Sequence, residues 1–489
     1  MTGREAETTE QQEAAMRHRA LGAVIGSAVG DALGAPFEFG PAGQYSKRFP
    51  APVLGGIGEM TGGGGFGWAP GEFTDDTQMA VVQAMSILAN DGIANNGIDG
   101  ADLFERFRTW AYDASDVGNQ TRAVLGSREP WHRAAEEHFR RHPDRAGNGA
   151  LMRATPTAVR FARASATETV EAAFTTAGVS HGGPHAGWGT ALFHLMVRAS
   201  LTGGDPFDAL ADALDTLPDD QHRYRDMLAP DWSPHDPGRA GAELPNGTVW
   251  GCLAEAVWAV RSTSTFADAI TTAIDLGGDT DTVAAVAGGL AGAIHGIAGV
   301  PSRWATYVHG HVTTPDGATT CRLADLQELT LRLLGHRVAL DTAPGEACGP
   351  TEIAPGLHAA DLTAAAGVPT DWAVMSFCRV GDRFDAHPVR RLAYLVDTER
   401  AEPDLEQVVA DAVDTIDAFL AESRPTVVHC HHGASRTGLI LRAWLMRQHG
   451  WDATIATEHL AERWPRLSQW NERFDHFLHT TWTQRTEIR

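Results

Sequence analysis

Two short acidic motifs, far apart in the sequence, carry the residue types of an oxygen-ligated metal site. Thr74-Asp75-Asp76 and Asp279-Thr280-Asp281-Thr282 combine carboxylates with hydroxyls, and each opens an apolar helical stretch. Thr and Asp are also ordinary helix caps, so one such motif alone indicates little. Two of them in one cleft would repel each other without a cation, and hard oxygen ligands favour Mg²⁺ or Mn²⁺ over zinc. The pair therefore predicts a binuclear metal site suited to hydrolysis.

A second constellation places a cysteine and an arginine in a loop between a predicted strand and a predicted helix. Cys430 and Arg436 lie in the pattern HCxxGxxR(S/T)G. Backbone N–H groups of such a loop turn inward around a phosphate, and the following helix directs its positive end there. This field favours the nucleophilic thiolate, and the guanidinium can hold two phosphate oxygens. The other residues expected around the phosphate are His431, His432, Gly433, Ala434, Ser435 and Thr437.

Helical patterns dominate the first two thirds of the chain. Residues 1–17 are expected to form a flexible tail, and residues 18–335 an all-α domain without a convincing alternating strand. In the first helix Gly22, Gly26 and Gly30 recur at four-residue spacing, which allows another backbone to approach closely. Further helices are predicted over residues 79–90, 101–113, 170–179, 187–200, 249–262, 266–276 and 323–334.

The pattern changes after a linker predicted at residues 336–350, which is rich in Gly and Pro. Short apolar runs at 372–378, 392–396 and 426–429 suit buried strands, and helical stretches alternate with or follow them. Strands alternating with helices indicate a small α/β domain with a mainly parallel sheet. This domain is expected to span residues 351–489.

Residues 18–335 resemble the ADP-ribosylglycohydrolases, including the dinitrogenase-reductase-activating glycohydrolase. The resemblance rests on six motifs in the expected order, with Ser180-His181 standing where the family usually has Thr-His. The six motifs lie at residues 30–34 with Glu38, 74–77, 116–121, 147–153, 180–181 and 277–282.

This resemblance implies a compact helical fold with two divalent cations, which would hold the ribose hydroxyls of ADP-ribose. Hydrolysis would free the ADP-ribosyl group from a protein side chain or a small acceptor, through an arginine, serine or other linkage. Glu38 is the candidate for positioning or deprotonating the attacking water, and Asp116 supplies a second carboxylate contact. The implied metal ligands are Thr74, Asp75, Asp76, Asp279, Asp281 and Thr282, and the implied pocket residues are Asn148, Gly149, Met152 and His181.

Residues 351–489 resemble the cysteine-dependent protein tyrosine and dual-specificity phosphatases. The resemblance implies Cys430 as nucleophile, Arg436 as phosphate ligand and no cofactor. Asp397 is the candidate general acid and Asp404 the alternative. Substrates would be phosphorylated proteins or small phosphate esters. His431 and His432 stand where lipid-directed relatives often carry lysine, which argues against a phosphoinositide.

Length, composition and net charge limit the number of domains, the partners and the location that we expect for this protein. A length of 489 residues indicates two or three domains, and a net charge of −23 argues against nucleic acid as a main partner. The five scattered cysteines and the polar N-terminus favour reduced thiols, no signal peptide and a cytoplasmic location. The most apolar stretch, 283–300, fits a buried helix and not a membrane span.

Together these features predict a bifunctional hydrolase that joins a metal-dependent ADP-ribosyl hydrolase to a cysteine phosphatase. Two alternatives stay open at this point. In one, a nucleotide-metabolism enzyme acts on ADP-ribose or sugar phosphates. In the other, the first domain only binds ADP-ribose and delivers the phosphatase to modified proteins.

Overall fold

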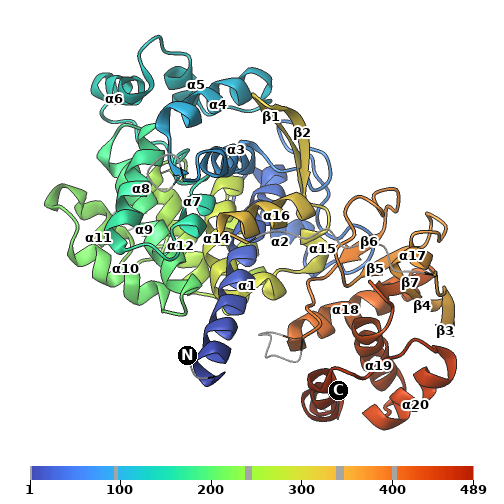
Figure 1. The fold of residues 1–489 in the computed structure, drawn as a ribbon. Coiled ribbons are helices and arrows are strands. Elements are labelled where there is room, and N and C mark those ends of the chain that lie inside the picture. Colours follow the sequence, from blue (N-terminus) through green and yellow to red (C-terminus); the bar gives the residue numbers. More distant parts are fainter. Residues whose placement is uncertain (1–2, 93–96, 237–244, 337–345, 399–404, 488–489) are drawn as a thin grey trace.

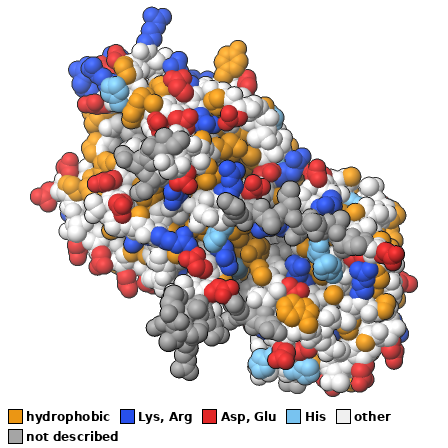
Figure 2. Space-filling model, viewed as in Figure 1, with side chains coloured by type: hydrophobic (Ala, Val, Ile, Leu, Met, Phe, Trp, Pro, Cys, Tyr) orange, Lys and Arg blue, Asp and Glu red, His pale blue; other side chains and the backbone are white. Residues whose placement is uncertain are grey.

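The structure is a computed structural model that describes residues 3–92, 97–236, 245–336, 346–398 and 405–487. These residues form two lobes, a larger helical domain and a smaller α/β domain (Figure 1). Acidic side chains are spread over both lobes in the face seen in Figure 2, in keeping with the net charge of −23. The predicted order, a helical domain followed by an α/β domain, is confirmed.

Helices make up almost all of the first domain. They are α1 (Gly3–Gly34), α2 (Gln44–Arg48), α3 (Asp75–Ala89), α4 (Gly100–Asp113), α5 (Asn119–Leu125), α6 (Trp131–Arg141), α7 (Thr155–Arg160), α8 (Ala166–Gly178), α9 (Pro184–Leu201), α10 (Pro206–Asp215), α11 (His222–Met227), α12 (Val249–Arg261), α13 (Phe266–Asp275), α14 (Thr280–Gly299), α15 (Ser302–Ala305) and α16 (Leu323–Leu333), with short turns η1 (Ala35–Phe37) and η3 (Asp219–Gln221).

The centre of this domain is an antiparallel pair of helices, α1 and α14, which pack backbone against backbone. Gly22 faces Gly292 and Gly26 faces Gly288, where an added Cβ would lie 2.5 Å from the Gly288 carbonyl oxygen. The predicted close approach at the glycines is confirmed. Both helices are long and apolar enough to span a membrane, but 94% and 78% of their most apolar windows are buried inside the protein. Their apolar surface therefore forms the core of the helical domain.

Two sequence expectations for this domain need correction. Helix α1 begins at Gly3, so most of the segment expected to be a flexible tail is helical. A hairpin of β1 (His309–Thr314) and β2 (Gly317–Arg322) lies within the domain that was expected to be all-α. The hairpin was not predicted because apolar and polar residues do not alternate clearly along its strands. Both strands are rich in Thr, β1 also contains two His residues, and β2 is mostly exposed.

The second domain is built on a five-stranded sheet in the order β3-β4-β7-β5-β6. All neighbouring strands are parallel except β3 and β4, so the mainly parallel prediction is confirmed. The linker predicted at 336–350 lies largely outside the described residues. The elements are β3 (Thr351–Ala354), β4 (Leu357–Asp361), α17 (Leu362–Ala365), β5 (Ala373–Ser376), β6 (Arg390–Leu392), α18 (Leu405–Ala421), β7 (Thr426–Cys430), α19 (Ser435–His449), α20 (Ala453–Arg463), α21 (Glu472–Phe477), η4 (Leu478–Trp482) and α22 (Thr483–Glu487).

Strand β6 is shorter than the predicted strand and lies earlier in the chain. It ends at Leu392, so most of the predicted run 392–396 leads away from the sheet toward Asp397. Strands β3 and β4 were not predicted, because each has only a few residues and β3 lies at the edge of the sheet. Strand β3 pairs with β4, and β4 pairs with β7, which places residues 351–361 in the same domain as Cys430.

Two candidate catalytic sites

The two distant acidic motifs meet at the N-terminal ends of α3 and α14. Asp31, Asp76 and Asp281 form one buried group, and Glu38, Asp279 and Asp281 form a second. Within each group the carboxylate oxygens lie within 4.8 Å of one another. Asp281 belongs to both groups, so its carboxylate is placed to contact two neighbouring cations.

Asp31 is a member of this cluster that was not predicted as a metal ligand. Its position follows from the packing of α1 on α14, since Gly30 and Gly34 allow α1 to approach the first turn of α14. The Asp31 carboxylate accepts hydrogen bonds from the backbone N–H of Thr74 (3.0 Å) and of Thr77 (3.0 Å). Asp31 thus fixes the start of α3 and, with it, the position of Asp76.

The hydroxyl and amide groups around the cluster orient its carboxylates. The Thr282 hydroxyl donates to Asp76 Oδ1 at 3.3 Å, and the Asn148 amide donates to Asp279 Oδ2 at 2.8 Å. The Thr74 hydroxyl accepts from the backbone N–H of Asp76 and so caps α3, the alternative role considered for this motif. Asn148, predicted to face the substrate, therefore also holds a predicted metal ligand in place.

The charge balance of the cluster calls for a cation. Among the described residues no basic side chain pairs with Asp31, Asp76, Asp279 or Asp281, and none of the described residues offers a hydrogen bond to the buried Asp76 Oδ2. Burial, reinforced by neighbouring carboxylates, raises the pKa of Asp76 and of Asp281 well above the usual range. Burial raises the pKa of Glu38 to about 8, with Asp279 and Asp116 adding to the rise. This all-oxygen donor set fits hard divalent cations.

These raised pKa values predict how the stability of the metal-free protein depends on pH. A carboxyl group whose folded pKa is raised contributes stability that is full below its unfolded pKa and is lost as pH rises through the folded value. For Glu38 the window runs from about 4.3, the unfolded value, to about 8. In EDTA the melting temperature should therefore fall between about pH 5 and pH 8.

Excess Mn²⁺ should raise the melting temperature most at pH 8, because it binds the ionised carboxylates of the folded state. Differential scanning calorimetry at about pH 5 and at about pH 8, with and without Mn²⁺, measures the change in melting temperature. An equal shift from Mn²⁺ in an Asp76→Asn variant would contradict binding at this cluster.

The predicted wall of the pocket rests on a buried cation. Arg153 is fully buried and donates to the carbonyl oxygens of Gly149 and Thr176 and to the Ser180 hydroxyl. No carboxylate pairs with it among the described residues, and burial lowers its pKa to about 9. His181 packs directly behind Gly149, where a Cβ would lie 2.9 Å from the imidazole. The structure thus gives His181 a supporting position, and its contact with substrate stays a prediction, as does that of the buried Met152.

Cys430 ends the buried central strand β7, and α19 begins after the loop that follows it. The loop conformation needs Gly433, which has φ 66° and would place a Cβ 2.7 Å from the Ala360 carbonyl oxygen. The Trp464 indole donates to the Gly433 carbonyl oxygen at 2.6 Å and so stabilises the conformation of the loop. Cys430 is 2% exposed, and the Thr437 hydroxyl is buried without a hydrogen-bond partner among the described residues. The strand, loop and helix predicted from the sequence are all present.

Arg436 and Asp397 lie together at the mouth of this loop. The guanidinium donates to the Phe377 carbonyl oxygen at 2.7 Å, and its Nε lies 3.9 Å from Asp397 Oδ2. Asp397 Oδ1 accepts from the Ser435 hydroxyl and the Asn471 amide, both at 3.0 Å. Asp397 therefore has the position expected of the general acid, while that role stays a prediction. The alternative, Asp404, lies outside the described residues.

The two histidines of the loop differ in exposure. His431 is half-buried and its backbone carbonyl accepts from Leu362, whereas His432 is exposed beside it. Ala434 precedes the first turn of α19, and Ser435 is buried against Asp397. The structure therefore brings together the predicted loop residues around Cys430, and their contact with a phosphate stays a prediction.

Comparison with known proteins matches each domain separately. The family model described as ADP-ribosylglycohydrolase matches residues 12–340, and that of the dual specificity phosphatase catalytic domain matches residues 379–481. An ADP-ribosylarginine hydrolase of Pseudomonas putida is 32% identical over 330 residues, which cover 65% of this chain and 82% of that protein. The ADP-ribosyl-dinitrogen reductase glycohydrolase of Rhodospirillum rubrum is 32% identical over 287 residues, covering 58% and 88% respectively. A solved ADP-ribosylglycohydrolase-related protein complex superposes with a TM-score of 0.50 at 30% identity, over 65% of this chain and 97% of that one.

Proposed function

Because this chain belongs to the ADP-ribosylglycohydrolase family and also contains a dual specificity phosphatase catalytic domain, we propose that it is a bifunctional hydrolase. The first activity releases ADP-ribose from arginine side chains, and the second hydrolyses phosphate monoesters. The arginine linkage is supported by the similarity to an ADP-ribosylarginine hydrolase. A cytoplasmic setting is supported by the five cysteines, which form no disulfide with one another in the part of the chain that the structure describes.

The first activity is supported above all by the position of Asp281, which belongs to both carboxylate groups, one of which also contains Glu38. Asp31, Asp76, Asp279 and Asp281 would hold two divalent cations, either Mg²⁺ or Mn²⁺. When bound, such cations orient sugar hydroxyls and lower the pKa of water. Glu38 lies at the half-exposed edge of the cluster, where its carboxylate can take a proton from the attacking water. The carboxylates also stabilise positive charge that develops at the anomeric carbon.

In the second activity the Cys430 thiolate attacks phosphorus and displaces the alcohol of the ester. Asp397 gives its proton to the leaving oxygen, and Arg436 with the loop N–H groups holds the phosphoryl oxygens. Water then attacks the phosphocysteine, which restores the thiolate and releases inorganic phosphate. The geometry of Asp397, between Arg436 and Ser435, supports this assignment.

A panel of ADP-ribosylated substrates that differ only in linkage tests the first activity. Incubation of the full chain with Mn²⁺ or Mg²⁺ should release ADP-ribose from arginine-linked protein faster than from serine-linked protein. Binding of ADP-ribose without release from any substrate would instead identify a binding module. Phosphotyrosine peptide and phosphorylated ADP-ribose, compared at equal concentration, separate a protein phosphatase from a nucleotide-metabolism enzyme.

A further inference from the structure

The segment that leads to Asp397 lies against the helical domain. Leu392, the last residue of β6, donates its backbone N–H to the Thr306 hydroxyl at 2.9 Å. The side chains of Leu392 and Tyr394 pack against the hydrophobic core of the helical domain, and the Tyr394 ring lies 6.0 Å from that of His18. The segment that leads from β6 to the predicted general acid therefore contacts residues of the helical domain.

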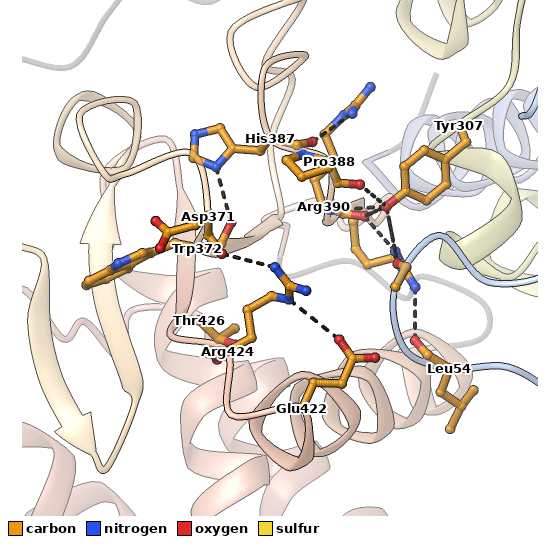
Figure 3. A network of polar contacts seen from close by, with 12 residues as sticks. Leu54, Tyr307, Asp371, Trp372, His387, Pro388, Arg390, Glu422, Arg424 and Thr426 are labelled. Atoms are coloured by element: carbon orange, nitrogen blue, oxygen red, sulfur yellow. Dashed lines mark hydrogen bonds and ion pairs between the residues drawn. The ribbon is translucent and has the colours of Figure 1, made fainter.

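The hydroxyl of Tyr307 makes several polar contacts between the helical domain and the phosphatase domain. Its ring is buried in the helical domain and its hydroxyl points to the segment before β6 (Figure 3). The hydroxyl oxygen lies 3.2 Å from the Pro388 carbonyl oxygen and 3.1 Å from that of Arg390, and it accepts from the Arg390 N–H at 3.1 Å. One hydroxyl therefore fixes the backbone at both Pro388 and Arg390.

Arg391 completes the attachment from the side of the phosphatase domain. Its side chain is fully buried, and its guanidinium donates to the carbonyl oxygens of Leu54 and Gly56, both at 2.9 Å. It also donates to the Tyr307 hydroxyl at 3.0 Å. A buried guanidinium that loses such partners carries a desolvation cost, so this attachment resists displacement of β6.

The consequence for catalysis follows from the short distance along the chain. Asp397 follows β6 by only a few residues and reaches Ser435, Asn471 and Arg436 at the mouth of the phosphate loop. A cleft of about 410 Å³ opens beside Asp397 and Arg436, and its lining also includes Ala324 and Gln327 of α16. Residues of both domains therefore line the cleft beside Asp397.

We infer that Tyr307 and Arg391 are positioning residues for Asp397, so that the helical domain completes the phosphatase site. The inference rests on the proposed phosphatase activity and goes beyond it, since it makes proton delivery to the leaving group depend on the helical domain. Nucleophilic attack by Cys430 depends on β7 and α19, which the Tyr307 contact does not touch.

The test compares two aryl phosphates in the full chain. Phenyl phosphate leaves as a phenol with a pKa of about 10, close to that of tyrosine, and needs the general acid. The leaving group of p-nitrophenyl phosphate is far more acidic and needs it much less. A displacement of a catalytic group by about 1 Å can lower the reaction rate by about 10²-fold. Tyr307→Phe should therefore lower kcat/KM for phenyl phosphate by about 10- to 100-fold, and for p-nitrophenyl phosphate by less than about 3-fold.

Two comparisons make the result specific to Asp397. Tyr224→Phe removes another buried hydroxyl, which donates to the His185 carbonyl oxygen within the helical domain, and should leave both rates unchanged. In an Asp397→Asn background Tyr307→Phe should cause no further loss on phenyl phosphate, because the acid is already absent.

Equal loss on both aryl phosphates, or a full additional loss in the Asp397→Asn background, would overturn the positioning role. If the wild type does not hydrolyse p-nitrophenyl phosphate, the phosphatase activity itself is wrong and the positioning role falls with it. If the wild type hydrolyses it and Tyr307→Phe leaves the ratio of the two rates unchanged, only the positioning role is wrong.

Discussion

Replacing Asp281 by asparagine is expected to lower kcat/KM for release of ADP-ribose from arginine-linked protein by about 10³-fold or more. Asp281 lies in both carboxylate groups, so its loss weakens both predicted cation positions at once. Metal assistance contributes several kcal/mol to such hydrolyses, and each 1.4 kcal/mol is about tenfold in rate. Chromatography of the released ADP-ribose, at saturating Mn²⁺, measures the rate.

An exposed carboxylate of the same domain provides the control for Asp281. The carboxylate of Asp268, in the first turn of α13, accepts a hydrogen bond from the Thr265 hydroxyl and is otherwise exposed, so Asp268→Asn should retain full activity. Phosphatase activity should survive in Asp281→Asn, because Cys430 lies in the other domain. Release of ADP-ribose by Asp281→Asn within tenfold of wild type would show that the shared carboxylate is not essential.

Replacing Cys430 by serine is expected to lower kcat/KM on p-nitrophenyl phosphate by about 10⁴-fold or more, since a serine hydroxyl in this loop stays protonated and is a far weaker nucleophile. The substitution changes one atom at a buried position, so the fold should be retained. Release of nitrophenol by stopped-time absorbance measures the reaction. ADP-ribose release by the same protein should equal that of wild type.

Cys348→Ser is the matched control for Cys430. Cys348 is also a free thiol of the same domain, and it contacts Asp361 of β4 through its backbone N–H, a hydrogen bond that does not involve the sulfur. This variant should hydrolyse p-nitrophenyl phosphate as wild type does. Equal activity of Cys430→Ser and Cys348→Ser would rule out a thiolate mechanism.

Local sequence by itself determined the parts of both sites that depend on residues close together in the chain. The loop from Cys430 to Thr437 forms where it was predicted, because strand β7, Gly433 and the first turn of α19 are specified by adjacent residues. The acidic motifs at α3 and α14 were likewise predicted at helix starts. The helical and α/β character of the two domains also followed from hydrophobic periodicity.

Tertiary structure alone decided which distant groups complete the sites. Asp31 joins the acidic cluster because the glycines of α1 allow that helix to lie against α14, and glycine spacing does not name the partner helix. Asp397 reaches the phosphate loop along a segment whose place depends on Tyr307, Leu54 and Gly56 in the other domain. Such contacts join residues far apart in sequence, and they form only when two packed surfaces match in shape and hydrogen bonding. Local propensity carries no information on that match.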